Sequence, residues 1–138
     1  MIERLLEKGL LERVEHDPRA ARELLGEADR HLTSAVRIAS DDPNGAYQLL
    51  YDAARKAIVA HMTAGGYRVV KGRPGAHETT GRYGSAALAS AEAATANFDR
   101  IRRNRNRSEY ELRFFDLDEV AADLEHARAI VAAVAALL

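Results

Sequence analysis

Three helix-start signals constrain the fold of this 138-residue chain more than any other feature of its sequence. Asp17-Pro18 and Asp42-Pro43 each place a capping aspartate before a proline, which suits the first position of a helix. Asp116 has Glu119 three residues downstream, which is the spacing of a capping box. Because apolar residues recur at helical spacing after each signal, we expect each signal to open an amphipathic helix.

The other helices are predicted from periodicity and from glycine stops. Residues 1–15 have the pattern of a short helix interrupted at Gly9, and Gly65-Gly66 is typical of a helix C-terminus. Residues 67–76 contain two glycines and a proline and form the longest irregular segment, and loops of that length are often functional. We expect helices over residues 1–15, 18–40, 43–65, 77–95, 98–110 and 116–138.

These elements predict an all-α protein, an antiparallel bundle of four or five helices in a single domain over residues 1–138. A short N-terminal helix precedes the bundle, which spans residues 18–137. The composition agrees, since alanine supplies much of the 47% hydrophobic content and aromatic residues make up only 6%. This mixture favours closely packed helices over a sheet, which would need more β-branched and aromatic residues.

Composition also excludes several classes of protein. The formal net charge of −1 excludes a generally basic nucleic-acid-binding protein, so any nucleic-acid contact has to use a local patch. The absence of cysteine excludes disulfides, thiolate metal sites and a cysteine nucleophile. The N-terminal sequence MIERLLEK lacks a signal-peptide core, and the uncharged run over residues 129–138 is too short to span a bilayer. We therefore expect a cytoplasmic protein without a membrane span.

Short motifs for catalysis and for cofactor binding are missing. None of the five histidines has another histidine three to five residues away on the same predicted helix, as a helical metal site would require. The glycines of residues 65–75 do not follow the strand–glycine–helix order of a phosphate-binding loop. Ser85 and Ser90 lie outside any nucleophile-elbow motif. The sequence therefore predicts neither a metal ion nor another cofactor.

The stretch from Phe98 to Tyr110 carries five arginines within eight positions. One stripe of the predicted helix is apolar at both ends and polar in the middle: Ala94, Phe98, Ile101, Arg105, Ser108 and Leu112. A guanidinium beside a core stripe is costly unless it is paired or lines a wet cleft. The pattern favours a helix that faces a polar groove or a partner, and the alternative is a solvated surface with scattered ion pairs.

Four polar residues lie on the flank next to Arg105 and complete a candidate site: Arg102, Asn106, Glu109 and Tyr110. His77 lies where the irregular segment meets the next predicted helix, and it is a further candidate for ligand contact. His61 falls on a core-facing stripe, so we expect it to be a hydrogen-bonded interior residue.

The segment RRNRNRSEY, residues 102–110, resembles the signature of the HEPN superfamily of small α-helical bundles from prokaryotic toxin–antitoxin and defence systems. That signature is an arginine, often followed by asparagine, and then a histidine after four to six residues. Arg105-Asn106 matches its start, whereas Tyr110 stands where histidine is common. Residues 46–68 and 75–80 resemble the second helix and the following loop of a branch that ends in Arg-Asn-x-x-Glu-Tyr. The resemblance covers roughly residues 18–137.

The resemblance implies a homodimer in which two copies of the motif form a metal-independent ribonuclease site. In that family the arginine contacts phosphate and the histidine assists the attacking 2′-hydroxyl. Carried over, this gives Arg105, Asn106, Glu109 and Tyr110 catalytic roles, with Arg102 and His77 binding the substrate. Tyrosine is a poor general base at neutral pH, so Glu109 or His77 would have to supply the base.

Two other functions remain open. In the first, the same groove belongs to a non-catalytic HEPN module that binds nucleotide, RNA or a partner, for which the family implies a nucleotidyltransferase-type antitoxin. In the second, Arg105 and Glu109 form a purely structural ion pair at helical (i, i+4) spacing. Replacing Arg105 by an apolar residue of matched volume would then be nearly neutral for stability.

Overall fold

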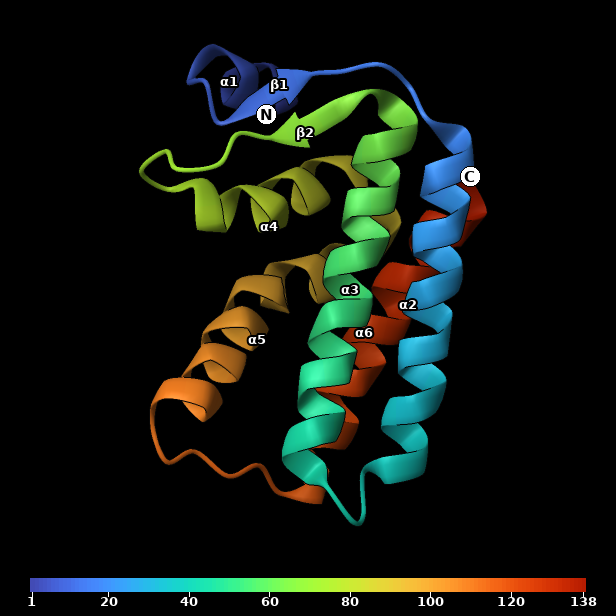
Figure 1. Cartoon of the computed structure of the whole chain (residues 1–138), viewed down its shortest axis with the longest axis vertical. Helices are drawn as coiled ribbons and strands as arrows, with labels where there is room; N and C mark the ends of the chain where they lie inside the picture. The colour runs from blue at the N-terminus through green and yellow to red at the C-terminus, as the bar shows by residue number, and fades with distance from the viewer.

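The computed structural model describes all residues from Met1 to Leu138 and is predominantly helical, as the sequence predicts. Six α-helices, one 3₁₀ turn and two short strands follow one another along the chain (Figure 1). In chain order they are α1 (Ile2–Glu7), β1 (Leu11–Arg13), α2 (Pro18–Ile38), α3 (Pro43–Gly65), β2 (Tyr67–Val69), α4 (Ala76–Ala87), the 3₁₀ turn η1 (Ala89–Ala91), α5 (Glu92–Tyr110) and α6 (Leu117–Leu137).

All three predicted helix-start signals are confirmed. The carboxylates of Asp17 and Asp42 accept hydrogen bonds from backbone N–H groups three residues later, at 3.1 Å and 2.9 Å. Asp116 and Glu119 form a complete capping box at the start of α6. At the other end of α3, Gly66 has a φ of +81°, a conformation that glycine adopts without strain. Local chemistry therefore sets the ends of the three longest helices.

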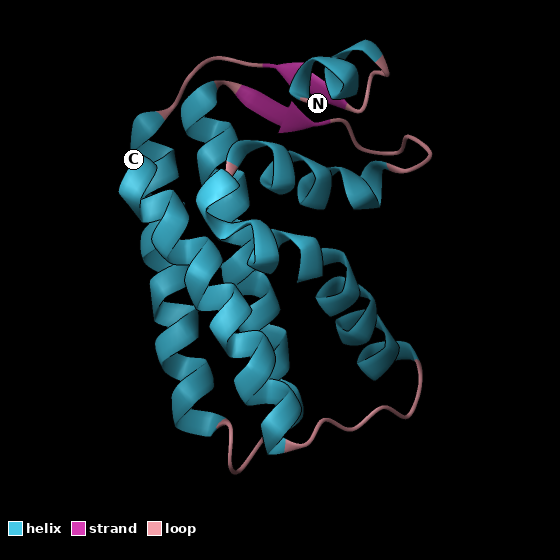
Figure 2. Cartoon of the chain, turned by 180° about the vertical axis from the view of Figure 1, so that it is seen from behind, coloured by secondary structure: helices cyan, strands magenta, loops and turns pink.

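The core is built where α2, α3 and α6 pack lengthwise, with α3 central and α2 running opposite to the other two (Figures 1 and 2). The α2 helix turns one alanine inward every seventh residue, at Ala21, Ala28 and Ala35, and all three are fully buried. Side chains this small let the axes of two helices approach closely. The alanines of α2 thus allow this helix to pack closely against α3.

Residues 1–15 and 67–76 differ from the prediction. The N-terminal helix ends at Glu7, the chain turns at Gly9, and residues 11–13 form a strand instead of continuing the helix. That strand pairs antiparallel with residues 67–69, with Leu11 opposite Val69, so the irregular segment begins as a strand. The pairing buries Leu11 and joins Glu12 to Arg68 by an ion pair, so tertiary contacts outweigh the local helical pattern.

The predicted helix over residues 77–95 is also wrong in its second half. The helix ends at Ala87, and after the turn η1 a new helix starts at Glu92 and continues through the whole arginine-rich stretch. The glycines of α4 serve packing: a Cβ atom at Gly84 would lie 2.9 Å from Ile58 Cδ1, and one at Gly81 would lie 3.1 Å from Phe98 Cδ2. They allow α4 to lie closely against α3 and α5.

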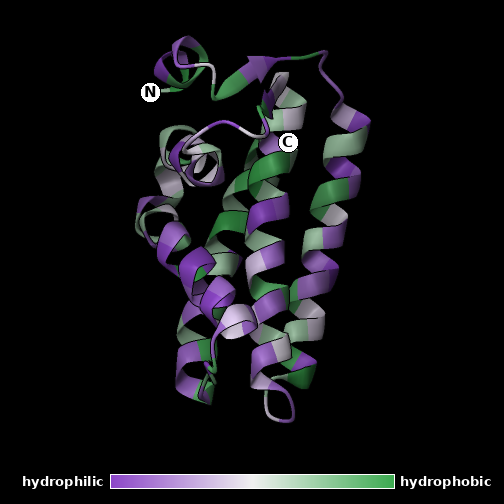
Figure 3. Ribbon diagram, turned by 60° about the vertical axis from the view of Figure 1, so that its left-hand side comes forward, coloured by the Kyte–Doolittle hydropathy of each residue, from purple (hydrophilic) through white to green (hydrophobic).

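Helix α5 lies beside the three core helices and carries hydrophilic residues along most of its C-terminal half (Figure 3). Its N-terminal half contributes Ala94, Phe98 and Ile101 to the core. Residues 111–116 then lead back to α6 in an extended path. None of the helices combines the length and the apolar composition that a bilayer crossing requires.

Candidate functional site

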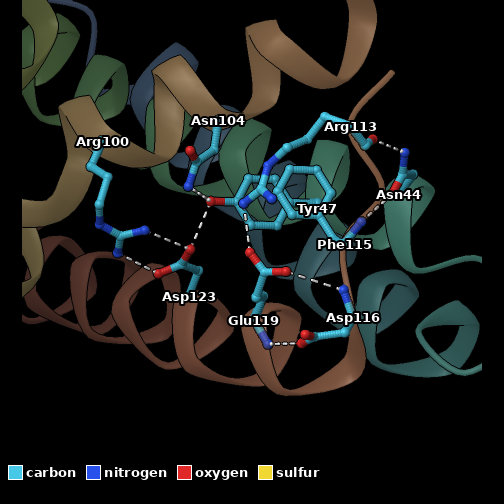
Figure 4. A network of polar contacts seen from close by, with 9 residues as sticks. All are labelled: Asn44, Tyr47, Arg100, Asn104, Arg113, Phe115, Asp116, Glu119 and Asp123. Atoms are coloured by element: carbon cyan, nitrogen blue, oxygen red, sulfur yellow. Dashed lines mark hydrogen bonds and ion pairs between the residues drawn. The ribbon is translucent and has the colours of Figure 1, made fainter. Parts of the chain in front are cut away.

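One side of α5 is joined to α6 by a bidentate ion pair. The Arg100 guanidinium donates to both carboxylate oxygens of Asp123, at 2.7 Å and 3.1 Å (Figure 4). Asp123 is only 4% exposed and also accepts a 2.7 Å hydrogen bond from the hydroxyl of Tyr47 on α3. Asn104 donates to that same hydroxyl at 3.3 Å. Three helices therefore meet at one satisfied polar cluster.

The pKa values of this cluster follow from its geometry. Burial raises the pKa of Asp123, but hydrogen bonds from Arg100 and Tyr47 and the charge of Arg100 outweigh burial, so the pKa lies below its usual range. Burial and the hydrogen bond to Asp123 raise the pKa of Tyr47. Asp123 is therefore charged and Tyr47 is neutral over the whole physiological range.

The segment between α5 and α6 is fixed by Asn44 near the start of α3. The Asn44 side-chain amide donates to the Arg113 carbonyl and accepts from the Phe115 N–H, both at 2.9 Å (Figure 4). The Phe115 ring stacks on Tyr47 at 3.7 Å between centroids. The Arg113 guanidinium carbon lies 4.8 Å from the centroid of the Phe115 ring, and Arg113 pairs with Glu119. Local sequence patterns do not reveal the contacts of Asn44 with this segment, because the partners lie about 70 residues apart in the chain.

Arg105 lies on a different side of α5, against α3. Its Nε donates to Gln48 Oε1 at 2.9 Å, and its guanidinium carbon lies 5.3 Å from the centroid of the Tyr51 ring. One terminal nitrogen donates to Asn106 Oδ1 at 3.1 Å and lies 3.6 Å from a Glu109 oxygen. The side chain is 28% exposed. Arg105, Asn106 and Glu109 therefore lie together at a half-open polar seam.

The other arginines of this stretch also have acidic partners. Arg102 is nearly buried and binds Asp99 at 2.8 Å, and Arg103 shares the same carboxylate at 3.5 Å. Arg107 pairs with Glu111 at 3.4 Å on the solvent side. Six arginines over residues 100–113 thus face five carboxylates: Asp99, Glu109, Glu111, Glu119 and Asp123. Most of the positive charge is balanced locally, and the excess is concentrated around Asp99.

Two of the predicted site residues lie apart from this seam. Tyr110 is 83% exposed at the last turn of α5 and makes no side-chain hydrogen bond. His77 lies at the start of α4, is exposed, and has only its neighbour Glu78 as an ionic partner, at 3.6 Å. No hydrogen bond or ion pair joins His77 to α5. By contrast, His61 is hydrogen-bonded as predicted, with Nδ1 2.8 Å from the Tyr83 hydroxyl, and burial lowers its pKa.

A run of exposed apolar side chains follows the arginine helix. Leu112 does not continue the helical stripe as predicted, since α5 ends at Tyr110 and Leu112 is 94% exposed in the segment beyond it. Phe114 and Leu117 are also largely exposed. Inward residues alternate with these outward ones because the backbone is extended there. We call Tyr110, Leu112, Phe114 and Leu117 the apolar rim.

The seam offers guanidinium, amide and carboxylate groups without a histidine. A guanidinium fork suits phosphate and carboxylate oxygens, so the seam can bind an anion through paired N–H groups. The structure contains no cluster of three or more histidine, aspartate or glutamate side chains arranged to hold a metal ion. Two surface hollows of about 490 Å³ lie nearby: one between α4 and α5, lined in part by Asp99, and one among α3, β2 and α4, lined in part by Arg55.

Comparison with known proteins gives no relative from which a function could be inferred. No protein-family model, no curated protein and no solved structure matches this chain.

Proposed function

We propose that this protein is a HEPN-type module of a toxin–antitoxin or defence system that acts as a homodimer and binds RNA through Arg105 and Asn106. The observation that carries the proposal is the way Arg105 is held. A solvated surface arginine makes few fixed contacts, whereas Arg105 is oriented by Gln48 and by the face of Tyr51 and still remains 28% exposed. A pre-positioned, accessible guanidinium is suited to phosphate recognition.

The apolar rim supports association with a second protein surface. Leu112 and Phe114 are large, exposed and follow the end of α5 directly in the chain, and exposed apolar patches are typical of interaction sites. A second copy of the chain would bring two Arg105 seams together if it covered the rim. A nucleotidyltransferase-type antitoxin is the other partner that the proposal includes.

Metal-independent ribonuclease activity is the second candidate function, and Glu109 is the observation that favours it. Its carboxylate lies 3.6 Å from the Arg105 guanidinium, so a base and a phosphate-binding cation are neighbours on one helix. Tyr110 lies one residue further on and has a free hydroxyl for hydrogen bonding. A base within reach of a bound phosphate is the minimum that 2′-hydroxyl attack requires.

Both functions are tested in one experiment with purified protein and Arg105→Ala. Fluorescence anisotropy with a labelled single-stranded RNA measures binding, and incubation of that RNA in EDTA measures cleavage. We expect the wild type to bind and Arg105→Ala to bind at least tenfold more weakly while remaining folded at the assay temperature, because a hydrogen-bonded charge contact is worth about 1.5–3 kcal/mol. Unchanged RNA affinity in Arg105→Ala would contradict the proposal.

Glu109→Gln separates the two candidates. It keeps the shape of the side chain and removes the base. Cleavage by the wild type that disappears in Glu109→Gln, with binding retained, would establish the ribonuclease. A folded wild type that binds RNA without cutting it would assign the binding module.

A further inference from the structure

Tyr51 is the one buried tyrosine whose hydroxyl has no partner in the protein. Three tyrosines are buried, and two of them are satisfied, Tyr47 by Asp123 and Tyr83 by His61. Tyr51 is only 8% exposed, yet its hydroxyl makes no hydrogen bond. The sole fully enclosed side-chain nitrogen or oxygen without a partner is Arg113 Nε, so the Tyr51 hydroxyl is reached by solvent. The Tyr51 hydroxyl is therefore a donor that faces solvent on an otherwise buried ring, whereas the other two buried tyrosines bond to protein groups.

The ring of Tyr51 is fixed from two sides. Phe98 of α5 stacks on it with 5.6 Å between ring centroids, and the Arg105 guanidinium lies over it at 5.3 Å. Gln48, three residues before Tyr51 on α3, holds Arg105 in that position. The hydroxyl is therefore presented at a defined place in the seam between α3 and α5.

Three arginines lie on the helix faces next to Tyr51, and one of them, Arg105, lies over its ring. Arg55 follows Tyr51 by four residues on α3, so the two side chains are neighbours on one helix face. Arg102 and Arg105 follow the stacked Phe98 by four and seven residues on α5, so they share the face that meets Tyr51. Burial raises the pKa of Tyr51, and the charges of these arginines oppose that rise, as expected of cations close to the hydroxyl.

The carboxylates near these arginines leave their donors incompletely used. Arg55 lies 3.8 Å from Asp52, and Arg105 lies 3.6 Å from Glu109, both longer than a hydrogen bond. Arg102 binds a single oxygen of Asp99, whose other oxygen faces Arg103. The bidentate pairing that satisfies Arg100 in the α6 cluster is not repeated here. The seam therefore keeps positive charge and free N–H groups for a ligand.

We propose that this seam between α3 and α5 is a binding site for a phosphate monoester, with the Tyr51 hydroxyl as a hydrogen-bond donor and three arginines of the neighbouring helix faces as cations: Arg55, Arg102 and Arg105. A monoester carries nearly two negative charges at neutral pH, whereas each phosphodiester within an RNA chain carries one. Three arginines and one hydroxyl donor match the more highly charged group. The site thus deepens the proposed RNA-binding function, on which it rests, by selecting RNA that ends in a phosphate.

The test compares ligands that differ only at the end. Fluorescence anisotropy is measured with one RNA sequence carrying a 5′-phosphate, a 3′-phosphate or hydroxyls at both ends, with the label placed internally. Calorimetry with inorganic phosphate and with AMP tests whether the free group suffices. We expect at least one phosphorylated end to bind about tenfold more tightly than the hydroxyl form, the size of one charge-assisted hydrogen bond.

Tyr51→Phe removes only the hydroxyl and keeps the stacked ring, so the fold is preserved. We expect it to abolish the preference for a phosphorylated end, and Arg55→Gln to reduce that preference. Tyr67→Phe on β2 and Arg103→Gln on the solvent side of α5 are the matched controls, and both should keep the wild-type preference. Equal thermal unfolding of Tyr51→Phe and the wild type shows that any loss is not due to unfolding.

The outcomes separate this site from the function on which it rests. RNA that binds equally with either kind of end, while Arg105→Ala weakens it, overturns the phosphate site and supports RNA binding. Tyr51-dependent binding of AMP or inorganic phosphate without any RNA binding supports the phosphate site and overturns the RNA proposal. A preference that persists in Tyr51→Phe also overturns the site.

Discussion

Tyr47 and Tyr51 lie one turn apart on α3, and both are buried, but their hydroxyls have opposite surroundings. The Tyr47 hydroxyl donates to Asp123 and accepts from Asn104, and the charges around it are paired to within 3.1 Å. The Tyr51 hydroxyl has no partner, and the arginines beside it have acidic partners that are distant or shared. The arginine-rich helix supplies Arg100 at the first site and Arg102 and Arg105 at the second, where α3 adds Arg55.

The difference between the two sites separates structural arginines of α5 from arginines that are available to a ligand. Arg100 is a structural residue because its two terminal nitrogens meet the two oxygens of a buried carboxylate. Arg105 is oriented by neutral groups, Gln48 and the Tyr51 ring, and its one acidic partner, Glu109, lies 3.6 Å away, beyond hydrogen-bond distance. The number of arginines says little about function, whereas the quality of each acidic partner separates the cations that hold the fold from those that are free to bind.

Asp123→Ala should cause the largest loss of stability, because it disrupts the fully paired cluster around Tyr47. The substitution removes the acceptor of Tyr47 and the partner of Arg100, and because Arg100 is partly exposed and can be hydrated, the loss is about 3 kcal/mol in the free energy of unfolding. Urea denaturation followed by circular dichroism measures it. Glu125→Ala, an exposed carboxylate on α6 that pairs with Arg128, is the control and should change stability by less than about 0.5 kcal/mol.

Tyr47→Phe and Tyr51→Phe compare the two hydroxyls directly. Tyr47→Phe removes a hydrogen bond to a buried carboxylate and should lower the free energy of unfolding by about 2 kcal/mol. Tyr51→Phe removes a hydroxyl without a partner, so its stability should stay within about 0.5 kcal/mol of the wild type. Equal losses in the two variants, by urea denaturation at pH 7, would contradict the difference between the two sites.

The pH dependence of unfolding tests whether the charge of Asp123 stabilises the fold. Its folded pKa lies below the ordinary value of 3.8, so its contribution to stability is fully present above that value and is lost as pH falls towards the folded pKa. The stability difference between wild type and Asp123→Asn should therefore be largest near neutral pH and shrink below about pH 4. A difference that stays constant from pH 7 to pH 2.5 would show that the carboxylate charge is not involved.

Substitutions in the apolar rim should have the smallest effect on the free energy of unfolding. Leu112→Ser and Phe114→Ser change exposed side chains, so the free energy of unfolding measured on dilute protein should change by less than about 0.5 kcal/mol. Light scattering after size exclusion should show that the double variant dissociates to monomers, while the wild type is a dimer. A monomeric wild type would contradict the homodimer proposal.

Features encoded within a few residues could be predicted from the sequence. Asp17, Asp42 and Asp116 each cap a helix through a contact only three residues away, and the periodicity of Phe98 and Ile101 is enough to place Arg105 on an inward stripe. The predominantly helical fold follows from these local patterns. Periodicity alone could not place Leu112, because it does not show where a helix ends.

Features that depend on distant partners could not be predicted. The strand at residues 11–13 exists because residues 67–69 lie beside it, and its own sequence continues a helical pattern. Asp123 gives no sign in the sequence that Arg100 and Tyr47 converge on it. The open hydroxyl of Tyr51 becomes visible only when α3 and α5 are brought together, since no property of an isolated tyrosine distinguishes it from Tyr47.

The most direct test of the account is to measure stability and RNA affinity on Arg100→Gln and Arg105→Gln in parallel with the wild type. Thermal unfolding and fluorescence anisotropy are recorded on the same preparations, with the anisotropy taken at a temperature where all three proteins are folded. The account predicts that Arg100→Gln unfolds at a clearly lower temperature with RNA affinity unchanged, and that Arg105→Gln loses RNA affinity while its unfolding temperature falls much less than that of Arg100→Gln. Arg105→Gln that unfolds as early as Arg100→Gln and binds RNA as well as the wild type would contradict it.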